Sequence, residues 1–199
     1  MATAVLLDLG NVVLGVDFRR VFSAWARAAD VDEDRFYEHW SLDDAYKAHE
    51  RGELHFADYA EHLGTVFDVT LDEQDWLAGW NDIWTEPFAD VINLLPDVAA
   101  RYPLYCFTNT NDAHTQYWRA NYPGALAHFK HIFVSSEIGA RKPDVTAFQQ
   151  VCEQMQQVPS DVLFLDDTQE NVQGALEAGL NAICTPDQQA VVRELERLL

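Results

Sequence analysis

The sequence is poor in positive charge. Its 199 residues include 33 Asp and Glu but only 13 Lys and Arg, which gives a formal net charge of −20 at pH 7. The basic residues are spread along the chain rather than clustered. Nucleic acids and anionic membranes are bound by clustered Lys and Arg, so the composition argues against both as partners. A phosphate site in so acidic a protein has to be built from local cations, backbone N–H groups and a metal.

Long apolar runs and a cysteine framework are also lacking. No run approaches the ~20 residues needed to span a bilayer, and no basic region precedes the first apolar stretch, as it would in a secretory signal. The three cysteines, Cys106, Cys152 and Cys184, fit no disulfide or zinc pattern. We therefore expect a cytoplasmic protein in a reducing environment, with one domain and room for a small insertion.

Short apolar runs alternate with helical patterns along most of the chain. The expected strands are residues 4–7, 104–107, 132–134, 162–165 and 182–184, and the expected helices are 91–100, 115–121, 145–156, 171–178 and 188–199. This alternation predicts an α/β fold with a doubly wound parallel sheet. In such folds ligands bind beyond the carboxyl ends of the strands.

Residues 17–84 interrupt this alternation. Aromatic residues recur there at helical spacing in two runs, Phe18-Phe22-Trp25 and Trp76-Trp80-Trp84. Five of the six tryptophans fall in this stretch, which indicates that it has an apolar face of its own. We therefore expect a core domain made of residues 1–16 and 85–199, with residues 17–84 inserted as a helical unit.

Carboxylates follow two of the expected strands. Asp8 comes directly after the run Ala4-Val5-Leu6-Leu7, and Asp166 and Asp167 come directly after residues 162–165. A carboxylate in this position can attack phosphorus to give an acyl phosphate, although a single aspartate at a strand end is more often a turn cap. Two adjacent carboxylates repel each other and are costly to bury without a cation. Mg²⁺ prefers such oxygen ligands, so the pattern predicts a divalent metal site.

Polar and cationic residues accompany these carboxylates. Thr108 and Asn109 end another expected strand, where a hydroxyl, an amide and backbone N–H groups can hold phosphate oxygens. Lys142 lies between Arg141 and Pro143, and its ammonium group can neutralise both phosphoryl oxygens and crowded carboxylates. Each signal alone is compatible with an ordinary turn or surface residue. Together with the aspartates they predict a site for a phosphoryl group and a metal.

The order of these motifs resembles that of the haloacid dehalogenase-like (HAD) hydrolase superfamily. The motifs are Asp8-Leu9-Gly10-Asn11-Val12, Thr108-Asn109, Lys142-Pro143 and Asp166-Asp167. The resemblance covers the whole chain and implies a Rossmann-like HAD core in which residues 17–84 are the helical cap of one subclass. The first motif and the segment His49-Glu50-Arg51-Gly52-Glu53 are most similar to bacterial phosphatases acting on glucose-1-phosphate. The phosphatase domain joined to some epoxide hydrolases is a more distant likeness.

The resemblance implies a role for each acidic motif. Asp8 would be the nucleophile, forming an aspartyl-phosphate intermediate, and also a ligand of Mg²⁺. Gly10 would contribute its backbone carbonyl to the metal. Asp167 would bind the metal directly, and Asp166 either directly or through water.

The resemblance also implies how the substrate is held. Thr108, Asn109 and Lys142 would bind the phosphoryl group of a small phosphorylated metabolite, and the cap would close over it and exclude water. In the cap, Arg51 could bind a hydroxyl or phosphate group and Glu53 could bind sugar hydroxyls. The same cap segment is equally compatible with a charged helix end that a glycine terminates.

One position departs from the family pattern. Most phosphatases of the superfamily carry a second aspartate two residues after the nucleophile, where this chain has Gly10. General acid–base help of this kind is typically worth ~10²–10⁴-fold in rate. The candidates for a replacement are Asp17, His49, Glu50 and His114. A leaving group of low pKa, such as an anomeric hydroxyl, would need less help from an acid. The missing aspartate therefore favours a sugar 1-phosphate as the substrate.

Three functions are compatible with the sequence. The first is an Mg²⁺-dependent phosphatase for a small, sugar-like phosphomonoester, acting as a monomer or homodimer. The second is a haloacid dehalogenase, in which Asp8 attacks carbon and the halide needs no proton, but the paired Asp166 and Asp167 are then unexplained. The third is a non-catalytic binding protein of the same fold, for which Gly10 is the best support.

Overall fold

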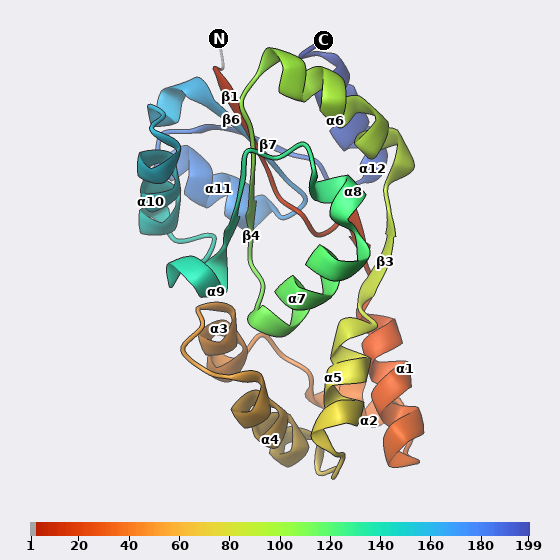
Figure 1. Ribbon diagram of the computed structural model, residues 1–199. Coiled ribbons are helices and arrows are strands. Elements are labelled where there is room, and N and C mark those ends of the chain that lie inside the picture. Colours follow the sequence, from red (N-terminus) through yellow and green to blue (C-terminus); the bar gives the residue numbers. More distant parts are fainter. Residues whose placement is uncertain (1–2) are drawn as a thin grey trace.

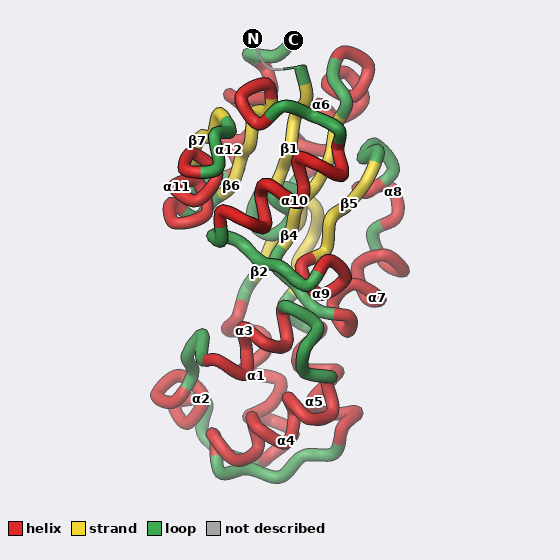
Figure 2. Tube along the Cα trace, turned by 90° about the vertical axis from the view of Figure 1, so that its left-hand side faces the viewer, coloured by secondary structure: helices red, strands yellow, loops and turns green. Residues whose placement is uncertain are grey.

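The computed structural model describes residues 3–199, and in this range five parallel strands form a central sheet in the order β5-β4-β1-β6-β7 (Figures 1 and 2). The strands are β1 (Ala4–Leu7), β4 (Leu104–Thr108), β5 (His131–Val134), β6 (Val162–Asp166) and β7 (Asn181–Cys184). The expected doubly wound parallel sheet is confirmed, and each expected strand is present to within a residue at either end.

Helices cover both faces of the sheet. One face carries α6 (Ala89–Arg101), α7 (Asp112–Asn121) and α12 (Gln188–Glu196), and the other carries α10 (Val145–Met155) and α11 (Gln169–Glu177). The side chains of β1 explain this layering, because Val5 and Leu7 belong to one apolar cluster and Ala4 and Leu6 to the other. A strand buried on both faces is typical of a parallel sheet between helices.

The expected helices are present, with small differences at their ends. The last helix ends at Glu196 rather than Leu199. Leu176, expected on the inner face of α11, is 46% exposed, whereas Val172 and Ala175 of that helix are buried. Three short helical elements of the core were not expected from the sequence: α8 (Pro123–Leu126), α9 (Ser135–Ile138) and the 3₁₀ turn η1 (Pro159–Asp161).

Five helices follow one another between Phe18 and Asn81 and pack beyond the carboxyl ends of the strands (Figure 1). They are α1 (Phe18–Ala29), α2 (Asp34–His39), α3 (Asp44–Glu50), α4 (Phe56–Phe67) and α5 (Glu73–Asn81). Aromatic residues fill the space between them. For example, the rings of Trp25 and Trp80 are stacked with their centroids 5.8 Å apart, and Trp25 Nε1 donates to the carbonyl of Trp76. We refer to these helices as the cap.

A two-stranded antiparallel ribbon connects the cap to the core. It is formed by β2 (Leu14–Val16) and β3 (Trp84–Pro87), and Val16 pairs with Trp84. The expectation that the helical pattern runs through Trp84 is therefore wrong, since α5 ends at Asn81. Ile83 and Trp84 are buried as expected, but the backbone satisfies its hydrogen bonds in the ribbon, where Asp17 N–H donates to the Ile83 carbonyl at 2.9 Å.

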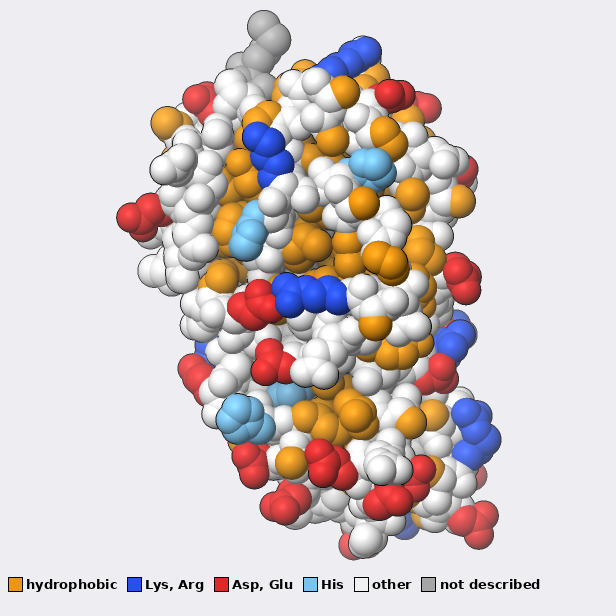
Figure 3. All heavy atoms as spheres, viewed as in Figure 1, with side chains coloured by type: hydrophobic (Ala, Val, Ile, Leu, Met, Phe, Trp, Pro, Cys, Tyr) orange, Lys and Arg blue, Asp and Glu red, His pale blue; other side chains and the backbone are white. Residues whose placement is uncertain are grey.

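The surface reflects the composition. On the face shown in Figure 3, acidic side chains are spread over both the core and the cap instead of gathering in one patch. Within residues 3–199, no helix has both the length and the apolar character needed to cross a membrane.

Candidate active site

Three neighbouring strand ends bring the expected site residues together. Asp8 follows β1, and its backbone N–H still pairs with the Leu165 carbonyl of β6 at 2.9 Å. This places Asp8 beside Asp166, the last residue of β6. Carboxylate oxygens of Asp8, Asp166 and Asp167 all lie within 4.8 Å of one another.

Lys142 supplies a buried positive charge to this cluster. Its side chain is 1% exposed, and Nζ lies 2.8 Å from Asp8 Oδ1 and 2.6 Å from Asp166 Oδ2. Burial by itself would lower the pKa of Lys142, but the charges of Asp166 and Asp8 outweigh it and raise the pKa above its ordinary value. Lys142 is therefore a permanent cation that joins two of the strand ends.

One lysine does not balance three carboxylates. Burial is the main reason that the pKa of Asp8 rises to about 7, against the opposing effect of Lys142. Burial and the charge of Asp166 also raise the pKa of Asp167. A second cation would relieve this repulsion, and an all-oxygen donor set suits Mg²⁺. Asp8 and Asp167 could hold such an ion, and Gly10, whose backbone carbonyl is the further ligand expected from the family resemblance, lines the same cavity.

The carboxylate of Asp166 is already well supplied with donors. Besides Lys142, it accepts hydrogen bonds from the Thr168 backbone N–H at 2.8 Å and from Asn171 Nδ2 at 3.0 and 3.1 Å. Asp167 has weaker contacts, with Asn11 Nδ2 and with Thr168 Oγ1, both at 3.3 Å. Asp167 is thus freer to bind a metal directly, and Asp166 mainly fixes the position of Lys142.

Asn109 holds the loop that carries Lys142. Its Nδ2 donates to the Lys142 carbonyl at 2.9 Å, and its Oδ1 accepts from the Lys142 N–H at 2.8 Å. The amide group expected to bind phosphate is therefore occupied by the backbone, and Asn109 orients Lys142. Gly174 of α11 packs against the same loop, where a Cβ would lie 2.0 Å from the carbonyl oxygen of Pro143.

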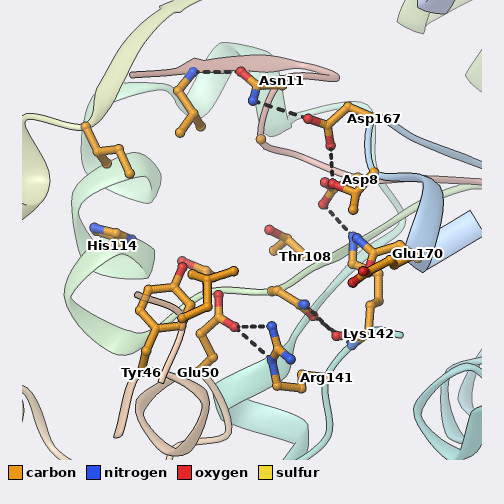
Figure 4. A pocket seen from close by; sticks show the side chains of 18 of the residues that line it. Asp8, Asn11, Tyr46, Glu50, Thr108, His114, Arg141, Lys142, Asp167 and Glu170 are labelled. Atoms are coloured by element: carbon orange, nitrogen blue, oxygen red, sulfur yellow. Dashed lines mark hydrogen bonds and ion pairs between the residues drawn. The ribbon is translucent and has the colours of Figure 1, made fainter. Parts of the chain in front are cut away.

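The strand ends open into a cavity of about 420 Å³ between the core and the cap (Figure 4). The core side is lined by polar residues, among them Asp8, Thr108, Lys142 and Asp167. The ribbon and the cap contribute mainly apolar and aromatic side chains: Val16, Phe18, Leu42, Tyr46, Ile83 and Trp84. The cavity is large enough for a small ligand that reaches from the carboxylates to the cap.

The cap residues that line the cavity differ from those expected. Arg51 and Glu53 are paired with each other at 2.7–2.8 Å, and neither is among the cavity-lining residues within the described part of the chain. Their neighbour Glu50 does line the cavity, and it is paired there with Arg141 of the core. The expected cap segment therefore reaches the cavity through Glu50, and which of its side chains face inward depends on how α3 is rotated.

Two of the four candidates for the missing acid–base group lie outside the cavity. Asp17 caps the N-terminus of α1 and pairs with Arg19. His49 is buried with Nδ1 at 2.8 Å from the Leu54 carbonyl, so this nitrogen carries the proton. Neither residue is among those that line the cavity in the described part of the chain.

The other two candidates, His114 and Glu50, do line the cavity. His114 Nε2 lies 3.0 Å from the Trp80 carbonyl oxygen. Because a carbonyl oxygen can only accept, Nε2 carries the proton. His114 Nδ1 is then unprotonated and accepts a hydrogen bond from Asn111 Nδ2 at 3.2 Å. Burial lowers the pKa of His114 to about 3, so it stays neutral with both nitrogens engaged. Glu50 is the remaining candidate, and Arg141 holds its carboxylate.

Sequence reasoning did not single out two amide side chains. Asn11 has a left-handed backbone (φ 54°), and its side chain joins the Val16 N–H to Asp167. Asn171 binds both oxygens of Asp166. Their signals were present, since Asn11 lies in the glycine turn after Asp8 and Asn171 lies in the first turn of the helix after Asp167.

With the geometry in view, comparison with known proteins identifies the family. The haloacid dehalogenase-like hydrolase family matches residues 2–179. The chain belongs to this family. Among curated relatives, D-ribitol-5-phosphate phosphatase of Bacteroides thetaiotaomicron is 22% identical over 90% of this chain and 89% of its own. The sesquiterpene phosphatase astK of Aspergillus oryzae is 27% identical over 78% of this chain and 80% of its own.

Solved structures agree on the HAD fold. An enzyme of the family from Bacteroides thetaiotaomicron, crystallised with magnesium and inorganic phosphate, has a TM-score of 0.83 at 22% identity, covering 92% of this chain and 93% of its own. The L-2-haloacid dehalogenase of Xanthobacter autotrophicus has a TM-score of 0.69 at 21% identity, covering 99% and 83%. Phosphatases and dehalogenases share this fold, so the reaction has to be argued from the site.

Proposed function

We propose that this HAD hydrolase is an Mg²⁺-dependent phosphatase that cleaves small phosphomonoesters through an aspartyl phosphate on Asp8. The observation that carries the proposal is the cluster of Asp8, Asp166 and Asp167, in which Asp8 and Asp166 are buried and Lys142 is the cation paired with both. Displacement at carbon needs the nucleophile and a cation but gives no reason for the third carboxylate. A metal and a phosphoryl group account for the whole set.

Each residue of the cluster has a part in this reaction. Asp8 attacks phosphorus, so that an Asp8 oxygen–phosphorus bond forms as the bond from phosphorus to the ester oxygen breaks, and the departing alkoxide takes a proton from solvent water. Water then attacks the phosphoryl group of the acyl phosphate and releases inorganic phosphate and free Asp8. Lys142, fixed by Asp166 and Asn109, stabilises the negative charge on the phosphoryl oxygens, and Thr108 donates a hydrogen bond to one of them. An Mg²⁺ ion held by Asp8 and Asp167 would neutralise further phosphoryl charge and help to align the phosphoryl group with Asp8.

The relatives support this assignment. Two curated relatives that align with most of the chain carry phosphatase names, and their substrates are a polyol phosphate and a sesquiterpene phosphate. The absence of a second aspartate at Gly10 favours substrates whose alcohol leaves readily, because no carboxylate follows the nucleophile to protonate it.

The deciding experiment is phosphate release from a panel of esters that includes glucose-1-phosphate and D-ribitol-5-phosphate. We expect release with Mg²⁺, little release with EDTA, and a fall of at least about 10³-fold in kcat for Asp8→Asn, because the amide is not a nucleophile. Asp17→Asn is the matched control, since it makes the same change outside the cavity. Release of halide from 2-haloacids without metal would instead identify a dehalogenase. Absence of both activities would support the binding protein.

A further inference from the structure

Glu50 and Arg141 form a buried ion pair between the cap and the core. Arg141 Nε and Nη2 both lie 2.8 Å from Glu50 Oε2, and the side chains of Arg141 and Glu50 are 15% and 5% exposed. Both residues line the cavity that contains Asp8. Figure 4 shows Glu50 reaching across the cavity wall to Arg141, with Tyr46 beside it. Nothing in the sequence predicted that these two residues would pair.

Backbone contacts next to Arg141 and next to Glu50 fix the positions of both residues. Arg141 directly precedes Lys142, whose backbone is fixed by two hydrogen bonds to Asn109. On the cap side, the chain just after Glu50 packs tightly against α9, because a Cβ on Gly52 would lie 2.4 Å from the carbonyl oxygen of Ser136. The position of the pair relative to the strand ends is therefore set by backbone contacts, and a ligand does not have to order it.

The pair leaves hydrogen-bonding capacity on each side. Its contacts use Nε and Nη2 of Arg141 and only Oε2 of Glu50. The Nη1 donors of Arg141 take no part in the pair. Tyr46 lies beside Glu50, and a carboxylate offers about four lone-pair sites, so acceptor capacity remains. The cavity thus holds a donor and an acceptor next to each other, at the end of the cavity that borders the cap.

This arrangement discriminates between kinds of alcohol. A hydroxyl group both donates and accepts, so it can use Arg141 and Glu50 together. A second phosphate group would meet the negative charge of Glu50, and a hydrocarbon would desolvate the pair without replacing its lost hydrogen bonds. The apolar residues of the ribbon and its neighbour, Val16 and Ile83, line the same cavity and suit the C–H face of a polyol or sugar.

We propose that Arg141 and Glu50 recognise hydroxyl groups on the alcohol portion of the substrate, which selects polyhydroxylated phosphomonoesters over bisphosphates and hydrocarbon phosphates. Arg141 contacts the substrate oxygen, and Glu50 accepts from the hydroxyl while positioning Arg141. This inference rests on the proposed phosphatase function and deepens it.

The test is substrate selectivity in Arg141→Lys and Glu50→Gln. Lysine keeps the charge but loses the planar fork, and glutamine keeps the shape but loses the charge. We expect kcat/KM for D-ribitol-5-phosphate, divided by that for phenyl phosphate, to fall about tenfold or more in each variant, mainly through KM, as for a lost hydrogen bond to a charged group. Leaving-group reactivity cancels, because each ratio is compared with that of the wild type.

Arg119→Lys and Glu137→Gln are the matched controls. They alter an exposed arginine–glutamate pair at 2.9 Å that joins α7 to α9, and neither residue lines the cavity. The selectivity ratio should stay at the wild-type value in both. A wild-type ratio in Arg141→Lys would overturn the proposal: with an equal loss on both esters the pair is only structural, and with no loss on either it does not contact the alcohol portion of the substrate.

A binding measurement separates this inference from the proposed function. With Asp8→Asn in the presence of Mg²⁺, calorimetry should show D-ribitol-5-phosphate binding that weakens about tenfold when Arg141→Lys is added, while inorganic phosphate binds equally to both proteins. If the wild type hydrolyses no ester but this difference is seen, the phosphatase proposal fails and hydroxyl recognition stands. If D-ribitol-5-phosphate binds both proteins equally, or neither, hydroxyl recognition is wrong.

Discussion

At the scale of single residues, the site depends on side chains that occupy each other's hydrogen-bonding groups. Asn109 and Asp166 look like ligand-binding residues in the sequence, but their polar atoms are largely used to hold Lys142. Among the motif residues, the groups left for a substrate and a metal are those of Asp8, Thr108, Lys142 and Asp167. A motif therefore identifies the neighbourhood of the chemistry, and the hydrogen-bond partners decide which member performs it.

His114 makes a residue-scale prediction about pH. Its pKa is about 3 in the folded protein because it is buried, against about 6.5 when unfolded, so protons bind preferentially to the unfolded chain. His114 therefore has no effect of this kind on the free energy of unfolding above about pH 6.5. As the pH falls from 6.5 toward 3, the unfolded chain binds the proton and the free energy of unfolding decreases. Between pH 7.5 and 4.5, the wild type should lose on the order of 2 kcal/mol more than His114→Gln, which can still donate to the Trp80 carbonyl.

Urea unfolding of both proteins at the two pH values measures this difference. All carboxylates titrate in both proteins, so their contribution cancels in the comparison. Equal losses of stability in the two proteins would show that His114 does not resist protonation in the folded state.

At the scale of elements, the contact between α3 and α9 controls how the cap meets the core. Gly52, just after α3, has φ +73° and almost touches the Ser136 backbone. Gly139, just after α9, has a similar φ of +68°, but a Cβ added there would have no neighbouring atom within 4 Å. The two glycines separate the cost of backbone conformation from the cost of a displaced cap.

We expect Gly52→Ala to lower stability by more than the roughly 1–2 kcal/mol that a left-handed alanine costs, and Gly139→Ala to lower it by about that amount only. Gly52→Ala should also raise KM, because displacing the cap moves Glu50 relative to Arg141. Thermal unfolding and steady-state kinetics on the two variants test this. Similar behaviour in both would mean that the cap tolerates displacement at this contact.

At the scale of the whole molecule, the net charge of −20 opposes the approach of an anionic substrate. Salt screens this repulsion, with a Debye length near 30 Å at 0.01 M and about 8 Å at 0.15 M. Raising NaCl over this range at constant Mg²⁺ should therefore increase kcat/KM for a phosphomonoester by roughly 2- to 10-fold. Sucrose at equal osmolality is the control and should give no increase. A decrease with NaCl would show that the local cations dominate the approach.

The sequence predicted the sheet well because its strands are buried on both faces and read as short apolar runs. It predicted the strand-end residues for the same reason, since parallel strands deliver their carboxyl ends to one edge. It did not predict that Trp84 belongs to a strand, because burial of Ile83 and Trp84 has the same pattern in a helix and in the ribbon. Nor could the sequence tell that Glu50 lines the cavity and that Arg51 and Glu53 do not, because this depends on how the cap lies on the core.

The ribbon that joins cap and core has a consequence for how such a chain can change. Val16 and Trp84 are paired across neighbouring strands, so the chain leaves the core and returns to it at almost the same place. A two-residue turn is enough to connect the ends of an antiparallel pair. Residues 17–83 can therefore be replaced by another segment without changing the topology of the core. A single in-frame exchange would then alter the part of the cavity that contacts the substrate alcohol, while the strand order and the pairing of Asp8 with Lys142 stay as they are.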